Sequence, residues 1–184
     1  MKKVVIIHGW GADPNSDWFP WLKGKLEERG FSVFVPAMPN TDNPKIKEWV
    51  DFLKDNLSPL DEDTYLIGHS IGCQTIMRYL GSFEEAKVVG IILVAPWFSL
   101  MNLEEGEEEI AKPWLETPID FEKVKRATEN IIALFSDNDS VVPIDNEKKI
   151  KEVLGAKTII YKNKGHFNAE DGVKELPEIL EFIK

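Results

Sequence analysis

The sequence predicts one α/β domain in which a parallel β-sheet is covered by helices on both faces. Short, almost continuously apolar segments of β-forming residues alternate with amphipathic helical segments along most of the chain, a pattern typical of strands buried on both sides. The 184 residues are enough for one compact domain with a substantial core. Repeated strand–helix–strand units with right-handed crossovers build a three-layer structure of this kind.

Six strands and five helices are expected, in near-regular alternation. The expected strands are Val4–Ile7, Phe31–Val35, Thr64–Ile67, Val88–Val94, Ile131–Phe135 and Lys157–Tyr161. The expected helices are Trp18–Glu28, Ile46–Asn56, Ile71–Leu80, Glu147–Leu154 and Val173–Ile183. The first helix is followed by Arg29 and Gly30, a basic residue and a glycine that are typical of a helix C-terminus.

One segment, residues 96–127, interrupts this alternation. It has no clear strand, and it contains several prolines, Trp97, Trp114 and an acidic run. Long connections in compact domains are commonly lids or binding loops, so we expect a lid-like insertion within a single domain that spans residues 1–184. A disordered loop is the alternative, but the aromatic content argues against it.

The charge of the chain excludes some classes of partner. The net charge is −10, which disfavours binding to nucleic acids and to anionic membranes. The densest acidic run, Glu104–Glu109, is interpreted as solvated surface, with steering of a cationic substrate as the alternative. No apolar run approaches the length of a membrane span, and the first strand resembles no signal peptide, so a cytoplasmic location is expected.

Neither a metal ion nor a nucleotide cofactor is indicated. The single cysteine, Cys73, is interpreted as a small buried apolar residue, and it has no partner for an internal disulfide. The three histidines have no spacing typical of metal ligands. Phosphate-binding glycine motifs of nucleotide sites are absent from the sequence.

Ser70 is the candidate nucleophile. It lies in Gly68-His69-Ser70-Ile71-Gly72, after an expected strand and before an expected helix. This G-x-S-x-G pattern at a strand-to-helix turn is the nucleophile elbow, which exposes a serine hydroxyl beside a helix N-terminus. A turn serine flanked by glycines through chance is the alternative. His69 is expected to have a structural role beside the elbow.

Asp139 and His166 are the candidates for the acid and the base that a serine nucleophile needs. Each follows an expected strand, and the order serine, aspartate, histidine is the one found with this type of elbow. Asp137 is the rival acid, and either aspartate could simply cap its own turn. Gly165 would permit a tight turn that directs the His166 imidazole across the strand ends, where it could act as a general base.

The first strand leads into a candidate oxyanion hole. The loop His8-Gly9-Trp10-Gly11 has glycines that let the backbone approach a reacting carbonyl group. We expect the backbone N–H groups of Trp10 and Ile71 to stabilise the oxyanion. The side chains and backbone expected to enclose the substrate come from Gly9, Trp10, Trp97 and Phe167.

Matching segments along nearly the whole chain resemble a family of compact serine hydrolases, the α/β-hydrolases of the retinoblastoma-binding protein nine type. The segments are His8-Gly9, Trp18, Trp21, Met38-Pro39, Ile67-Gly68-His69-Ser70, Arg78-Tyr79, Leu93-Val94, Phe121–Lys125, Asp139 and Gly165-His166-Phe167. The resemblance implies an α/β-hydrolase fold with six parallel strands in the order 2-1-3-4-5-6, which places Ser70 at the topological switch point. It also implies the triad Ser70, Asp139 and His166. Trp10 is bulkier than its counterpart in relatives with a more glycine-rich loop.

The expected function is therefore hydrolysis of carboxylic esters, thioesters or amides through an acyl-enzyme on Ser70. The substrate partner would be a small acyl compound, with short or medium acyl groups favoured by a shallow, apolar pocket. One alternative is a protein-interaction module on a hydrolase scaffold with vestigial activity, although the sequence indicates no protein partner. Another is acyl transfer to an acceptor other than water.

Overall fold

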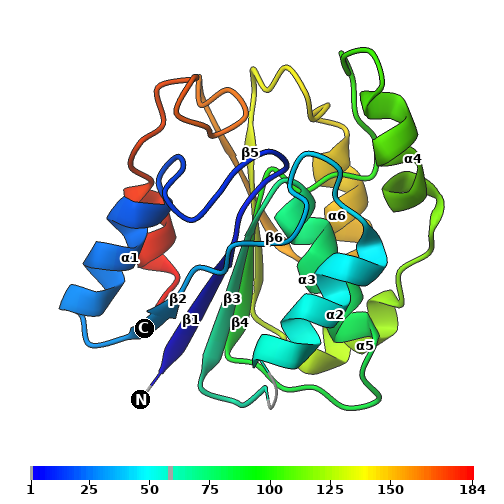
Figure 1. The fold of residues 1–184 in the computed structure, drawn as a ribbon. Helices are drawn as coiled ribbons and strands as arrows, with labels where there is room; N and C mark the ends of the chain where they lie inside the picture. The colour runs from blue at the N-terminus through cyan, green and yellow to red at the C-terminus, as the bar shows by residue number, and fades with distance from the viewer. Residues whose placement is uncertain (1, 58–59) are drawn as a thin grey trace.

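The computed structural model describes residues 2–57 and 60–184, and it forms one three-layer α/β unit (Figure 1). The strands are β1 (Lys3–Ile7), β2 (Ser32–Phe34), β3 (Thr64–His69), β4 (Gly90–Val94), β5 (Ile131–Ser136) and β6 (Lys157–Tyr161). They pair in parallel in the order β2-β1-β3-β4-β5-β6. The predicted α/β-hydrolase fold and strand order are confirmed.

Helices cover both faces of this sheet. They are α1 (Phe19–Glu28), α2 (Ile46–Leu57), α3 (Ile71–Gly81), α4 (Glu107–Glu116), α5 (Phe121–Ala127) and α6 (Asn146–Leu154). In Figure 1, α1 lies on one side together with the C-terminal 3-10 helix η1 (Pro177–Glu181), and α2, α3 and α5 lie on the other. No helix in the described ranges is long and apolar enough to cross a membrane.

The central strands are apolar because helices bury both of their faces. Every residue of β3, β4 and β5 is buried, whereas the edge strands β2 and β6 contain exposed residues. The carboxyl ends of the strands point to the top of Figure 1, where the long loops gather. In a parallel sheet this end is the usual place for a ligand site.

Two sequence-based expectations need correction. The predicted helix at Val173–Ile183 is wrong, because only the 3-10 helix η1 forms there. Pro177 would remove an interior α-helical hydrogen bond, and it instead begins the short helix. The segment 96–127, for which no helix was expected, contains α4 and α5, and the side chain of Asp120 caps α5 by accepting from the Lys123 N–H at 3.1 Å.

Buried polar side chains hold the segment 96–127 on α3. Arg78 donates to the carbonyl oxygens of Trp114 at 2.7 Å, Thr117 at 2.8 Å and Pro118 at 3.3 Å. Gln74 donates to the carbonyl oxygen of Trp97 at 2.6 Å. These bonds dock the start of the segment and its residues 114–118 against α3, while its role as a lid stays a prediction.

Replacing Arg78 with methionine is expected to destabilise the domain by about 3 kcal/mol, because three carbonyl groups lose their donor in a poorly solvated place. Denaturant unfolding followed by tryptophan fluorescence measures the change. The matched control is Arg126→Met, where the side chain is exposed and a change within about 0.5 kcal/mol is expected. Equal stability losses in the two variants would contradict the docking role of Arg78.

Candidate active site

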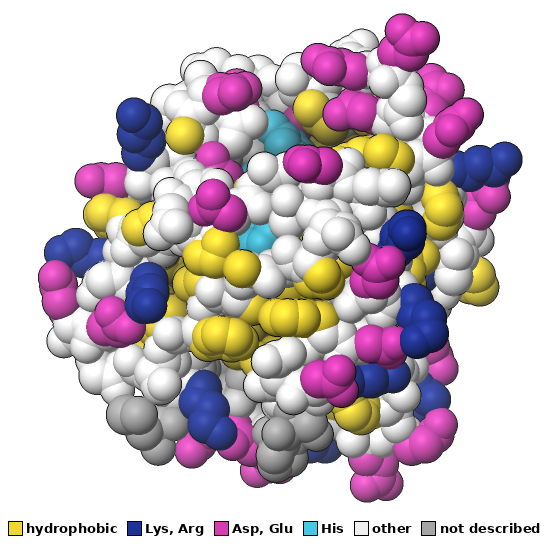
Figure 2. All heavy atoms as spheres, in the orientation of Figure 1, with side chains coloured by type: hydrophobic (Ala, Val, Ile, Leu, Met, Phe, Trp, Pro, Cys, Tyr) yellow, Lys and Arg dark blue, Asp and Glu magenta, His cyan; other side chains and the backbone are white. Residues whose placement is uncertain are grey.

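A cleft of about 490 Å³ lies over the carboxyl ends of β1 and β3. The strand order reverses between these two strands, so the cleft lies at the topological switch point of the sheet. Figure 2 shows histidine atoms in a hollow near the upper edge of the molecule, bordered by acidic side chains. Ser70, His69 and His166 line this cleft, together with Trp10 and Trp97. Residues far apart in the sequence therefore meet at the site that the motifs predict.

The backbone at Ser70 has the strained conformation of a nucleophile elbow. Its φ is 53° and its ψ is −117°, a region that residues with a side chain rarely adopt. The Ser70 N–H donates to the carbonyl oxygen of Val94 at 2.9 Å, which ties the turn to β4. Ser70 is 8% exposed, at the floor of the cleft.

The two glycines of the elbow are required by close backbone contacts. A Cβ on Gly68 would lie 2.7 Å from the backbone nitrogen of Cys73, and a Cβ on Gly72 would lie 2.9 Å from the carbonyl oxygen of His8 and closer still to that of Ile7. Helix α3 can therefore cross β1 and β3 at this distance only because neither glycine has a side chain.

Asp139 and His166 form a hydrogen-bonded pair beside Ser70. The His166 Nδ1 lies 2.9 Å from the Asp139 Oδ2, and both side chains are largely buried, with 13% and 3% exposed. The other carboxylate oxygen, Oδ1, accepts from the N–H groups of Val141 at 2.8 Å and Val142 at 2.9 Å. Asp139 thus caps its own turn and also contacts the imidazole, two roles that the sequence presented as alternatives.

Asp137, the rival acid, lies elsewhere. Its Oδ1 accepts from the Asn163 N–H at 2.9 Å, so it links the loops that follow β5 and β6. Among the hydrogen bonds of the described residues, none joins the Ser70 hydroxyl to His166. Such contacts are often long before substrate binds.

The loop that contains His166 is fixed by partners that the sequence did not reveal. The His166 N–H donates to the Asp171 Oδ2 at 2.6 Å, and the Ala169 N–H donates to the Asp17 Oδ1 at 2.8 Å. The Gly165 N–H donates to the Asn138 Oδ1 at 2.9 Å. Asp171 lies within the same loop, but the bonds that Asp17 and Asn138 accept span long sequence distances, and no local motif indicates them.

The prediction that Phe167 encloses the substrate is wrong. Its side chain is fully buried in the core and does not line the cleft, unlike its neighbours His166 and Asn168. Phe167 has a left-handed φ of 58°, and its carbonyl oxygen accepts from the indole of Trp18 at 3.0 Å. This turn directs the ring inward. The other predicted pocket residues, Gly9, Trp10 and Trp97, do line the cleft.

Hydrogen bonds of the buried His8 side chain hold the loop after β1 in place. The buried His8 accepts from the Met38 N–H through Nε2 at 3.1 Å, and its Nδ1 lies 2.9 Å from the Gly9 carbonyl oxygen. Because Nε2 accepts, the ring proton is on Nδ1, which donates to the Gly9 carbonyl oxygen; burial lowers the pKa of His8, which favours this neutral form. Trp10 lines the cleft, and Ile71 is the first residue of α3, where N–H groups have no partner within the helix.

The electrostatics of the cleft differ from the apolar pocket that was expected. Its lining includes four carboxylates, from Asp17, Asp42, Glu107 and Glu170, and none of the described lining residues is a lysine or an arginine. Burial raises the pKa of Asp17, with the neighbouring Glu170 acting in the same direction. Glu107 belongs to the acidic run Glu104–Glu109, which was interpreted from the sequence as solvated surface, with steering of a cationic substrate as the alternative.

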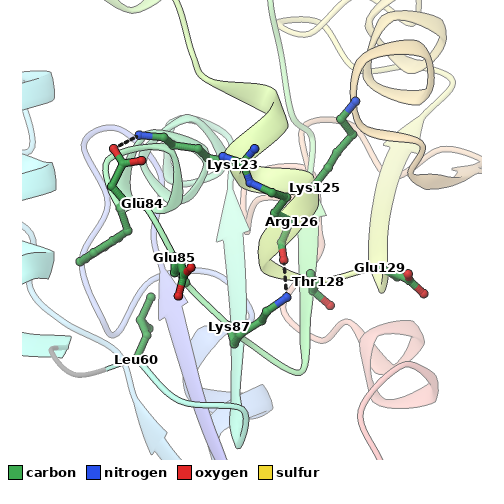
Figure 3. Close-up of a pocket in the computed structure, with 11 residues that line it drawn as sticks. Leu60, Glu84, Glu85, Lys87, Lys123, Lys125, Arg126, Thr128 and Glu129 are labelled. Atoms are coloured by element: carbon green, nitrogen blue, oxygen red, sulfur yellow. Dashed lines mark hydrogen bonds and ion pairs between the residues drawn. The ribbon is translucent and has the colours of Figure 1, made fainter.

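A larger hollow of about 1020 Å³ lies at the amino ends of β4 and β5 (Figure 3). Some of its charged side chains have partners within it: Lys123 pairs with Glu84 at 2.7 Å, and Lys87 donates to the Arg126 carbonyl oxygen at 2.8 Å. Its described lining contains no serine, cysteine or histidine. Within residues 2–57 and 60–184, no cluster of histidine, cysteine and carboxylate side chains could hold a metal ion.

Comparisons with known proteins agree with this architecture. The chain is 30% identical to the ydeN gene product of Bacillus subtilis and 29% identical to the serine hydrolase RBBP9 of Rattus norvegicus, over 99% of this chain and 94% of each relative. The crystal structure of the B. subtilis protein superposes with a TM-score of 0.90 at 31% identity, covering 98% of this chain and 96% of that one.

A more distant structure, Est1E from Butyrivibrio proteoclasticus, shares the fold with a TM-score of 0.71 at 18% identity, over 99% of this chain and 88% of its own. The sequence model of the serine hydrolase family matches residues 4–184. This chain therefore belongs to the serine hydrolase family.

Proposed function

We propose that this serine hydrolase cleaves carboxylic esters, thioesters or amides through an acyl-enzyme on Ser70. The observation that supports it most directly is the 2.9 Å hydrogen bond between His166 and Asp139, in the cleft that Ser70 also lines. A strained serine, a buried imidazole and a buried carboxylate in one cleft match the needs of a Ser-His-Asp mechanism.

Each member of the proposed triad has a defined role. The Asp139 carboxylate accepts from Nδ1 of His166, so the neutral imidazole has its proton on Nδ1 and a free lone pair on Nε2. The Ser70 hydroxyl turns toward Nε2 as substrate binds and transfers its proton there during attack on the carbonyl carbon. His166 then gives this proton to the leaving group. In the second half of the reaction, His166 takes a proton from water as the water attacks the acyl group, and it then returns a proton to the Ser70 oxygen as the acyl group leaves.

The proposed oxyanion hole consists of the backbone N–H groups of Ile71 and Trp10. Helix α3 begins at Ile71, so its N–H is available and the helix dipole favours negative charge there. Gly9 approaches closely enough that an added Cβ would lie 3.2 Å from His69, which keeps the Trp10 backbone near the elbow. Donors fixed in advance stabilise the tetrahedral intermediate at little reorganisation cost.

Turnover of p-nitrophenyl acetate and p-nitrophenyl butyrate tests this proposal. We expect hydrolysis of both, with a first burst of about one p-nitrophenol per chain if deacylation is slow. Analysis of the acyl product in the presence of alcohol or amine acceptors separates hydrolysis from acyl transfer. Absence of turnover on these esters and on matched thioesters and anilides would contradict the proposal.

The acidic lining of the cleft is expected to disfavour negatively charged acyl groups. We expect kcat/KM for p-nitrophenyl hemisuccinate to be about tenfold below that for p-nitrophenyl butyrate at low ionic strength, because four carboxylates face the cleft. The gap should narrow at high salt and in the double variant Glu107→Gln, Glu170→Gln. Equal rates on the two esters at low salt would show that the carboxylates do not act on substrate.

A further inference from the structure

His69 is the last residue of β3 and directly precedes the proposed nucleophile. It is 3% exposed, and it lines the cleft beside Ser70 and His166. The sequence indicated only a structural role for it, and the mechanism above does not use it. Its hydrogen bonding points to a more specific task.

The His69 ring donates to the backbone of His166. The His69 Nε2 lies 2.7 Å from the His166 carbonyl oxygen, and a carbonyl oxygen can only accept, so Nε2 has the proton. Burial, helped by the nearby His166, lowers the pKa of His69 to about 3, and the ring therefore stays neutral. Its one proton is committed to this bond.

Packing alone would not require a histidine here. The ring contacts Trp18 and Phe19, with both centroids 6.0 Å away, and also the His166 ring, with its centroid 5.1 Å away. The other nitrogen, Nδ1, is buried without a hydrogen-bond partner among the described residues. An unpaired buried acceptor is unfavourable, so an apolar ring would suit the packing better. The Nε2–H donor is the feature that distinguishes histidine from such a ring.

The backbone at His166 needs a partner on each side. Its neighbours Gly165 and Phe167 both have left-handed conformations, with φ values of 53° and 58°. Asp171 accepts from the His166 N–H at 2.6 Å, and His69 donates to the His166 carbonyl oxygen. These two bonds hold the peptide groups before and after the imidazole, and Asp139 holds the ring itself.

We propose that His69 is a positioning residue that fixes the backbone of His166 relative to Ser70, so that one dipeptide, His69-Ser70, sets the places of both nucleophile and base. This inference rests on the proposed function. When this hydrogen bond is lost, the His166 imidazole moves away from the position in which its Nε2 can contact the Ser70 hydroxyl. This lowers the rate of the chemical step rather than the affinity for substrate.

Three substitutions of His69 separate positioning from packing. His69→Phe keeps a ring among the aromatic neighbours but has no donor, His69→Gln places an amide N–H near the position of Nε2, and His69→Asn reaches only the position of Nδ1. We expect kcat on p-nitrophenyl butyrate to fall about 10- to 100-fold in His69→Phe and in His69→Asn, with KM within about threefold of wild type. His69→Gln should recover kcat to within about fivefold.

The His69 variants are expected to rank in the same order for their rate of inactivation by a fluorophosphonate. The probe needs the same proton transfer from Ser70, but it does not need to fit a pocket for the substrate. Thr128→Val is the control at the other end of the sheet, where the Thr128 hydroxyl donates to the Val89 carbonyl oxygen and accepts from the Asn130 N–H, and the substitution removes both hydrogen bonds. We expect its kcat to match wild type. Melting temperatures of all variants show whether a rate loss merely follows stability.

Two results would overturn the positioning role. One is a kcat for His69→Phe that equals that of wild type while Ser70→Ala is inactive. This result would leave the proposed function intact. The other is an equal loss of kcat in His69→Phe and His69→Gln that follows melting temperature, which indicates packing alone. A wild-type protein that neither hydrolyses esters nor reacts with the probe would instead contradict the proposed function itself.

Discussion

Replacing Ser70 with alanine is expected to lower kcat for ester hydrolysis by about 10⁴- to 10⁶-fold, because Ser70 has the only hydroxyl or thiol group among the described residues that line the cleft. Steady-state assays on p-nitrophenyl butyrate with freshly purified protein measure the loss. The fold should persist, because alanine has a similarly small side chain and is no more strained at φ 53° than the serine that it replaces.

A second substitution at the same position separates chemistry from stability. Ser70→Gly also removes the hydroxyl, but glycine adopts positive φ freely. We expect this variant to be as inactive as Ser70→Ala and more stable than wild type by about 1 kcal/mol. Activity of either variant above a few per cent of wild type would show that Ser70 is not the nucleophile.

The second large effect is expected from Asp139→Asn, with a fall in kcat of about 10⁴-fold. The backbone N–H groups of Val141 and Val142 hold Oδ1 and would select the oxygen of the new amide. Its NH₂ group then faces His166 and donates to Nδ1. The imidazole proton moves to Nε2, which can no longer accept the proton of Ser70.

Asp137→Asn is the matched control for this substitution. Asp137 lies two residues away and contacts the Asn163 backbone rather than His166. Its activity should stay within about threefold of wild type. If Asp137→Asn were the inactive variant and Asp139→Asn the active one, the assignment of the acid would be reversed.

The sheet could be predicted from sequence because its central strands are buried on both faces. Such strands are almost continuously apolar, as in Gly90–Val94 and Ile131–Ser136, so they stand out from the amphipathic helices between them. Helices α4 and α5 escaped prediction because Pro113 lies inside one and the other has only seven residues. The docking of α4 involves a hydrogen bond from Arg78 to the Trp114 carbonyl oxygen, a contact that no local sequence pattern indicates.

The candidate site was predictable where local turns determine it. The elbow at Ser70 and the turn at Asp139 are set by nearby glycines and backbone N–H groups. The orientation of Phe167 and the bond from His69 to the His166 loop depend on residues about a hundred or more positions apart. Patterns of residue types along one chain do not reveal such pairings.

Covalent labelling with a fluorophosphonate tests the central claim most directly. Intact mass should show one adduct per wild-type chain, and peptide mapping should place it on Ser70, with labelling abolished in Ser70→Ala. A wild-type protein that takes up no probe, or an adduct that persists in Ser70→Ala, would contradict the assignment of Ser70 as the nucleophile.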